Sequence, residues 1–272
     1  RAGSVYVTSG LGVSGTGGEI FIRGGTSSDS TGGAVTILSG SSLASTSGSL
    51  LFSTPGAGLT GSSGMIVLST GDGLSGNSGA LYIGSGKGVY GRGGHVYLTA
   101  GTGNSGTGGE LALRAGSSSD ASGGKLTISS GSSSQRASGE LVLSTGVAGA
   151  AGVSGIIAMS TGDASCGNSG AVYMGTGSSL SGRAGHVYLT AGTGDSGSGG
   201  ELLIRAGTSL DTSGGRTILV SGSSTTTTSG TLVIRSETAG TYGVTGAVIM
   251  STGDATCGTS GGAYIGPGSA AS

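Results

Sequence analysis

The chain has 272 residues, a formal net charge of −1 and only 8% charged residues, while glycine alone supplies 66 positions. A near-neutral chain has no basic face for nucleic acid, so we expect no nucleic-acid partner. No apolar run approaches the ~20 residues that cross a bilayer, which predicts no membrane span. Disorder is also disfavoured, because disordered chains are poor in hydrophobic residues and this chain is 34% hydrophobic.

One short unit recurs from the N-terminus to the C-terminus, and such self-similarity is the signature of a repeat architecture. The unit is x-Φ-x-Φ-x-x-Gly, in which Φ is aliphatic, followed by small residues and a closing Ser/Gly-Gly. The spacing is 15 residues, except for 16-residue units at Ser49, Glu140 and Thr231. Units begin at Ser4, Glu19, Ala34, Ser49, Met65, Ala80, His95, Glu110, Lys125, Glu140, Ile156, Ala171, His186, Glu201, Arg216, Thr231, Ala247 and Gly262.

The longer units fall six units apart, which reveals a second, longer period. His95 returns as His186, 91 positions later, and Cys166 returns as Cys257. We therefore expect a single domain over 1–272 that consists of three super-repeats, at approximately 1–91, 92–182 and 183–272.

Each unit opens with a β signature. In Val96-Tyr97-Leu98 the apolar residues alternate with polar or outward-facing ones, a period of two that is typical of a strand. A glycine such as Gly101 follows, where a turn with φ > 0 is cheap only without a Cβ. Since one unit cannot bury its own apolar face, units must stack. We predict an all-β fold, a β-solenoid of 18 stacked coils roughly 85 Å long at ~4.8 Å per coil. Its core would contain Val96, Leu98, Leu111, Leu113, Leu126 and Ile128.

The first position of successive units carries charges of alternating sign. Opposite charges on neighbouring strands lie ~5 Å apart and stabilise each other. We interpret this column as a charge ladder that fixes the register of the coils; the alternative is that it docks a neighbouring rod. The charge-ladder residues are His95, Glu110, Lys125, Glu140, His186, Glu201 and Arg216.

The third position also faces outward, but it is mostly apolar or aromatic. Strand propensity alone would select such residues, yet a soluble monomer rarely leaves an apolar stripe of this length uncovered. We favour lateral packing against another rod. The predicted lateral interface contains Tyr82, Tyr97, Tyr173, Tyr188, Phe21 and Leu203.

Tyrosines also mark the boundaries between super-repeats. The sixth unit of one and the first unit of the next would meet through Tyr82 with Tyr97, and again through Tyr173 with Tyr188. Tyr6 and Tyr264 have no such partner within the chain. We predict that these two residues form an end-to-end interface between rods.

No catalytic, cofactor or metal site is predicted. The sequence Gly101-x-Gly103-x-x-Gly106 matches a dinucleotide fingerprint, but that motif needs a following helix, and no segment has a helical period. The histidines, His95 and His186, lie a super-repeat apart, so no triad can form within the chain.

Two other residue types recur once per super-repeat. Asp72, Asp163 and Asp254 would lie ~29 Å apart, too far for a single calcium site, and we expect them to cap turns. Cys166 and Cys257 would be equally far apart, which excludes a mutual disulfide. These cysteines are either tolerated small thiols or the sites of a bond to another chain.

The short Gly/Ser/Thr coil with paired aliphatic residues resembles the β-solenoid class that includes insect antifreeze proteins and bacterial ice-nucleation proteins. It also resembles the long Ser/Thr/Gly repeat proteins of algae and protists, which are surface or fibre proteins. The resemblance covers the whole chain and implies an extracellular location. Ice-binding members carry regular Thr-x-Thr ranks, whereas this chain has outward triplets such as His95, Tyr97 and Thr99.

We therefore predict a structural protein and not an enzyme, with no cofactor. Its partner would be itself: rods would pack end to end and laterally into an extracellular filament. The alternative is a surface-binding solenoid, either an ice-binding protein or an adhesin stalk, whose ligand would be ice or another surface.

Overall fold

The computed structural model describes residues 3–13 and 15–269. It divides the chain into two units, Arg1–Gly131 and Ser132–Ser272. The predicted ends of the repeat array, Arg1 and Ser272, lie outside the described residues. The assignment of 1–272 to one domain of three super-repeats stays a prediction.

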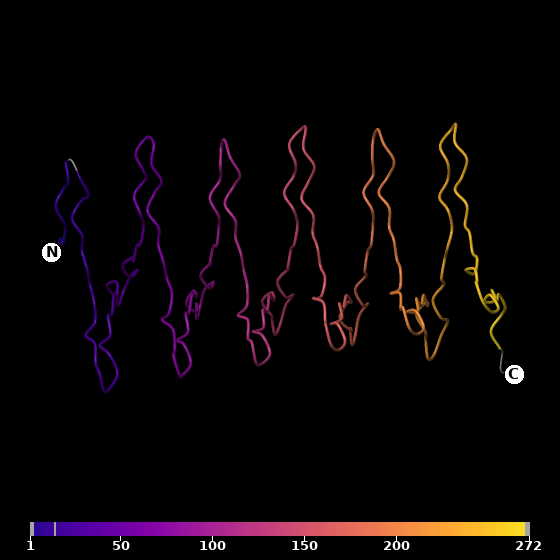
Figure 1. Ribbon diagram of the computed structural model, residues 1–272, viewed down its shortest axis with the longest axis horizontal. Coiled ribbons are helices and arrows are strands. Elements are labelled where there is room, and N and C mark those ends of the chain that lie inside the picture. The colour runs from indigo at the N-terminus through magenta and orange to yellow at the C-terminus, as the bar shows by residue number, and fades with distance from the viewer. Residues whose placement is uncertain (1–2, 14, 270–272) are drawn as a thin grey trace. The chain divides into compact units, whose positions relative to one another are not determined.

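The described residues form neither an α-helix nor a β-strand in either unit. Figure 1 accordingly draws extended stretches of chain separated by reversals, with no coiled ribbon and no arrow. The predicted all-β fold, a β-solenoid of stacked coils, is therefore wrong. A period of two fixes the side on which each side chain lies, but a strand also needs a neighbouring segment that exchanges backbone hydrogen bonds with it. Within the described part of each unit, the backbone hydrogen bonds join glycines of the same loop instead.

The predicted hydrophobic core is also absent, because no described residue is buried. The accessible surface is 27148 Å², against roughly 10,300 Å² for a compact protein of this size. Leu113, which was expected in a dry interior, is 57% exposed. The opposite wall of such a core would consist of Ser, Gly and Thr, which remove too little apolar surface from water to offset the entropy of ordering a glycine-rich chain. The same correction applies to Val96, Leu98, Leu111, Leu126 and Ile128.

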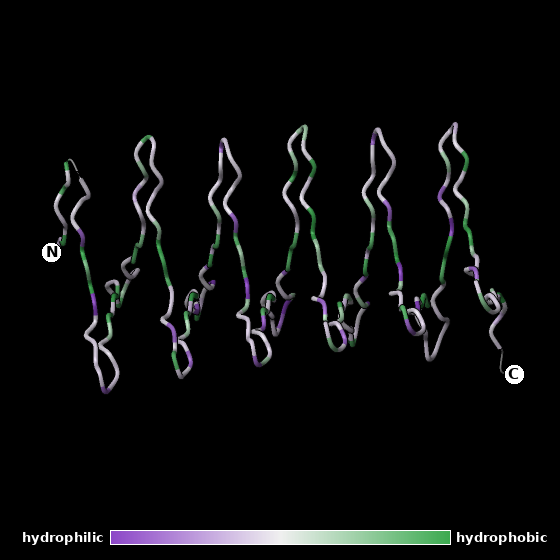
Figure 2. Tube along the Cα trace, in the orientation of Figure 1, coloured by the Kyte–Doolittle hydropathy of each residue, from purple (hydrophilic) through white to green (hydrophobic). Residues whose placement is uncertain are grey.

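The alternation of side chains along each extended segment is nevertheless present. Aliphatic side chains at the second position, from Ile20 to Val248, are 50–57% exposed, whereas the third-position Tyr173 is 94% exposed. First and third positions share a side, since the ring centroids of His95 and Tyr97 lie 5.7 Å apart. Figure 2 shows the apolar residues as green stretches that recur along the trace. The local backbone thus follows the period of two.

In the first unit, each of several repeats contains a loop that is closed by a backbone hydrogen bond. The amide of Gly18 donates to the carbonyl oxygen of Gly10 at 3.1 Å, which closes a loop across eight residues. The residue before such a loop is among the least exposed, as at Gly24 and Ala115, so this sixth position accepts only small residues. The same closure joins Gly33 to Gly25, Gly48 to Gly40, Gly109 to Gly101 and Gly124 to Gly116, each at 2.8 Å.

The second unit uses the same device. The amide of Gly200 donates to the carbonyl oxygen of Gly192 at 3.0 Å, and Ala206 is partly enclosed before the following loop. Bends in this unit recur at 165–167, 180–182, 195–197 and 210–212, with the 15-residue spacing of the sequence. Two further loops are closed between Gly215 and Gly207 and between Gly230 and Gly222, both at 2.8 Å.

The 16-residue repeats reverse the chain differently. In each of them an amide donates to the carbonyl oxygen three residues earlier, which is the hydrogen bond of a β-turn. The bonds join Gly61 to Gly58 at 3.3 Å, Gly152 to Gly149 at 3.1 Å and Gly243 to Gly240 at 3.2 Å. These turns recur at the spacing of the super-repeat, so the longer period of the sequence has a counterpart in the structure.

Candidate functional site

Each extended segment presents two surfaces with different chemistry. The aliphatic face consists of the side chains at the second and fourth positions of every repeat, such as Leu202 and Ile204. The tyrosine stripe consists of the third-position side chains, such as Tyr188 and Leu203, and the first-position charges lie on the same side. No second or fourth position of any repeat carries a charged residue. The aliphatic face is therefore uncharged, while the side with the tyrosine stripe is not.

The residues of the predicted lateral interface are exposed and separate. Their exposed fractions run from 70% at Leu203 to 94% at Tyr173. In the described chain, the contacts between aromatic rings join His95 to Tyr97 and His186 to Tyr188, each within one segment. The tyrosines of adjoining repeats make no such contact in either unit. The lateral interface stays a prediction for Tyr82, Tyr97, Tyr173, Tyr188, Phe21 and Leu203.

The predicted end-to-end residues are also open to solvent. Tyr6 is 87% exposed in the first unit, and Tyr264 is 96% exposed in the second. Neither ring contacts another aromatic ring among the described residues. The end-to-end interface likewise stays a prediction.

The predicted charge ladder forms no ion pair within the part of the chain that the structure describes. The ion pair found there joins Arg235 Nη2 to Glu237 Oε1 at 3.1 Å, and both side chains are more than 70% exposed. These residues lie two apart on one segment. Charges at the first position of successive repeats would meet only if the segments paired, and they do not. The side chains that stay unpaired are His95, Glu110, Lys125, Glu140, His186, Glu201 and Arg216.

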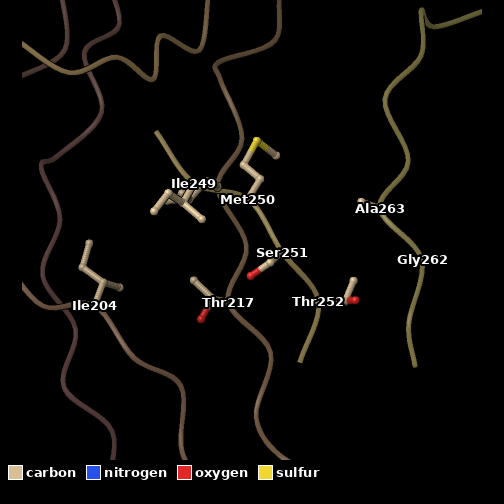
Figure 3. A pocket seen from close by; sticks show the side chains of 9 residues that line it. Ile204, Thr217, Ile249, Met250, Ser251, Thr252, Gly262 and Ala263 are labelled. Carbon is tan, nitrogen blue, oxygen red and sulfur yellow. The ribbon is translucent and has the colours of Figure 1, made fainter. Parts of the chain in front are cut away.

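The second unit contains an open hollow of about 860 Å³. Its lining includes the fourth-position side chains Ile204, Leu219 and Met250, from three different repeats. Figure 3 shows Ile204, Thr217 and Gly262 on different segments, with Ile249 to Thr252 along a further one. These three side chains, Ile204, Leu219 and Met250, are 61–70% exposed. The lining also includes Ile249 and the hydroxyl groups of Thr217, Ser251 and Thr252, so the hollow is a partly apolar surface that is open to solvent and can take up further apolar groups.

Hydroxyl groups at the sixth position hold several loops closed, which the sequence pattern alone did not reveal. Ser9 Oγ donates to the carbonyl oxygen of Gly18, and Ser85 Oγ donates to that of Gly94, both at 2.8 Å. The signal in the sequence is Ser or Thr at the sixth position, directly before a glycine in four of these repeats and before Pro55 in the fifth. The same bond is formed by Thr54, Thr161 and Thr176.

Serines within the loops cap a second set of turns. Ser118 Oγ, for example, accepts a hydrogen bond at 3.0 Å from the amide of Ala121, three residues later. Such a local bond is the usual reason for serine in turns. Equivalent bonds of 2.9–3.0 Å are accepted by Ser27, Ser42, Ser133, Ser209 and Ser224. Among the described residues no carboxylate of Asp72, Asp163 or Asp254 caps a turn.

Groups that could hold a metal are not assembled: no cluster of three or more His, Cys, Asp and Glu occurs among the described residues. Cys166 and Cys257 are exposed and carry free thiols. Each precedes a glycine with positive φ, 131° at Gly167 and 121° at Gly258. The chemistry that the described repeats offer is apolar contact, through the aliphatic face and the tyrosine stripe, and hydrogen bonding through Ser and Thr hydroxyl groups.

A membrane-crossing helix is not present among the residues described. Comparisons with protein-family models, with curated proteins and with solved structures find no match for this chain.

Proposed function

We propose that this chain is a structural protein that associates with further copies of itself, side by side and end to end, into a fibre outside the cell. One observation carries the proposal: no described residue is buried, although 34% of the sequence is hydrophobic. Apolar surface gains about 25 cal/mol per Å² when it leaves water. The chain therefore gains free energy wherever its apolar surfaces meet similar ones.

The backbone gives a second reason for association. Within the described part of each unit, the backbone hydrogen bonds lie in loops, and the extended segments keep unpaired N–H and C=O groups. Such rows of unpaired groups are templates for pairing with another chain. A second copy offers complementary groups and apolar side chains at the same 15-residue spacing.

The residues that carry acid–base chemistry support a mechanical role and not a catalytic one. They are distributed singly along the repeats, as with His95 and His186. The resemblance of the repeat to surface-fibre proteins supports the extracellular location. Tyr6 and Tyr264, both exposed, are proposed to contact each other where copies meet end to end.

The proposal is tested by sedimentation velocity and electron microscopy of the purified chain over a wide range of concentration. We expect the average mass to rise steadily with concentration and elongated assemblies to be visible. A monodisperse monomer at the highest attainable concentration would show that the chain is not a fibre protein. Thermal hysteresis of the same sample would instead favour the ice-binding alternative.

A further inference from the structure

We infer that the aliphatic face is the first contact between two copies: chains pair face to face through their second- and fourth-position side chains. The tyrosine stripes then lie on the two outer surfaces of the pair and join pairs into bundles. This inference rests on the proposed function, and it adds the face used, the partner (a second copy of this chain) and the order of assembly.

The charge distribution decides which face pairs first. Thr217 is the one polar residue at a second or fourth position, and no such position is charged. On the other side, the first-position charges lie beside the tyrosine stripe, as the 5.7 Å ring distance from His95 to Tyr97 shows. Burying an unpaired charge is costly, whereas burying aliphatic carbon is favourable. The aliphatic face can therefore leave water without that cost.

The hollow of the second unit indicates what the aliphatic face contacts. Ile204, Leu219 and Met250 come from three repeats and border one common space; Figure 3 labels Ile204 and Met250. These fourth-position side chains border the same space and yet stay 61–70% exposed, and the third-position Ile249 borders it as well. Side chains of the same kind and spacing fill this space best, and a second copy supplies them.

The exposed surface of the whole chain is far larger than one interface needs. A stable interface buries about 1,200–2,000 Å² in total. The chain exposes 27148 Å², which is roughly 17,000 Å² more than a compact protein of its size. Because the partner face is identical, the contact is isologous and closes on itself as a pair. Growth beyond the pair then requires a different surface, and the tyrosine stripe is the other apolar surface of each segment.

Two matched variants separate the faces. The aliphatic-face variant is Val187→Asp with Leu202→Asp; the stripe variant is Tyr188→Asp with Leu203→Asp. Both change the same two repeats and add the same charge, but on opposite sides of the segments. Because all four side chains are at least 57% exposed, neither variant disrupts a core of the single chain. Circular dichroism of the dilute monomer checks this directly.

The readout is the mass distribution by sedimentation velocity as a function of concentration. For the aliphatic-face variant we expect the concentration at which pairs form to rise about 100-fold or more. The stripe variant should pair as the unmodified chain does, but its mass should stop growing at two copies. Unchanged pairing in the aliphatic-face variant, or loss of pairing in the stripe variant, would overturn the inference while self-association, and with it the proposed function, stands. An unmodified chain that never associates would instead refute the proposed function.

Discussion

Glycine acts in two different ways in the loops. At Gly103 a Cβ would lie 2.8 Å from the carbonyl oxygen of Thr107, closer than real Cβ atoms come to such a group. At Gly167 the space is open, but φ is +131°, where residues with side chains are strained. The first glycine is required by close approach and the second by backbone conformation.

We expect Gly103→Ala to open its loop, because the added methyl group forces the backbone at Thr107 away. The closing hydrogen bond, from the amide of Gly109 to the carbonyl oxygen of Gly101 at 2.8 Å, should weaken. Hydrogen exchange at the amide of Gly109, followed by NMR, should accelerate roughly two- to tenfold, as loss of a bond worth about 0.5–1.5 kcal/mol implies. Gly106→Ala is the control, since a Cβ there meets nothing within 4 Å. Equal acceleration in both variants would show that close approach is not the reason for glycine.

At the scale of a single repeat, loops are closed by two interchangeable means. Repeats with alanine before the loop, such as Ala100 and Ala115, use a backbone bond between two glycines. Repeats with Ser85, Thr161 or Thr176 at that position use a hydroxyl bond to the carbonyl oxygen of the closing glycine. A small residue stands at this position in either case, but a hydroxyl group there does not exclude the backbone bond: the repeat of Ser9 has both bonds, and the repeats of Ser39 and Ser221 show the backbone bond alone.

Ser85→Ala should therefore weaken the closure of its loop. The lost bond, from Ser85 Oγ to the carbonyl oxygen of Gly94 at 2.8 Å, is exposed, so we expect a cost near the lower end of about 0.5–1.5 kcal/mol. The carbonyl ¹³C shift of Gly94 reports this acceptor directly and should move upfield. Ser85→Thr keeps the hydroxyl group and should leave the shift in place. If the two substitutions move it equally, the hydroxyl bond does not exist in solution.

Some features of these repeats could be predicted from the sequence, and others could not. The 15-residue spacing of the bends and the alternation of exposure follow from local constraints: glycine at the loop and a period of two before it. The predicted burial of Leu113 and the predicted contact of Tyr82 with Tyr97 both depended on pairing between neighbouring segments, which does not occur among the described residues. Register and partner are not encoded by a period of two when both neighbours carry the same pattern. The hydroxyl bond of Ser85 could not be predicted, because serine occurs throughout the chain and its presence at one position does not mark a closing bond.

At the scale of the whole molecule, the chain separates its surfaces by chemistry. The aliphatic face carries no charge, while the other side combines aromatic rings with the charges of the first position. Among the residues described, none of these first-position charges is paired within the chain. They are therefore free to pair with a second copy, and they should affect the contact made by the tyrosine stripe more than the contact made by the aliphatic face.

Salt should thus act differently on the two steps of assembly. Raising the ionic strength from about 0.01 M to 1 M shortens the Debye length from roughly 30 Å to 3 Å, which screens exposed charges but does not weaken apolar contact. We expect the concentration at which bundles form to rise roughly two- to fivefold for each charge pair that is screened, while face-to-face pairs persist. Glu110→Lys with Glu201→Lys should loosen bundles in the same way at low salt. Adding Lys125→Glu, Glu140→Lys and Arg216→Glu restores the alternation of sign and should restore bundling. Bundles that respond neither to salt nor to the reversal would show that the charge ladder has no part in assembly, and that apolar contact alone sets the register of the copies.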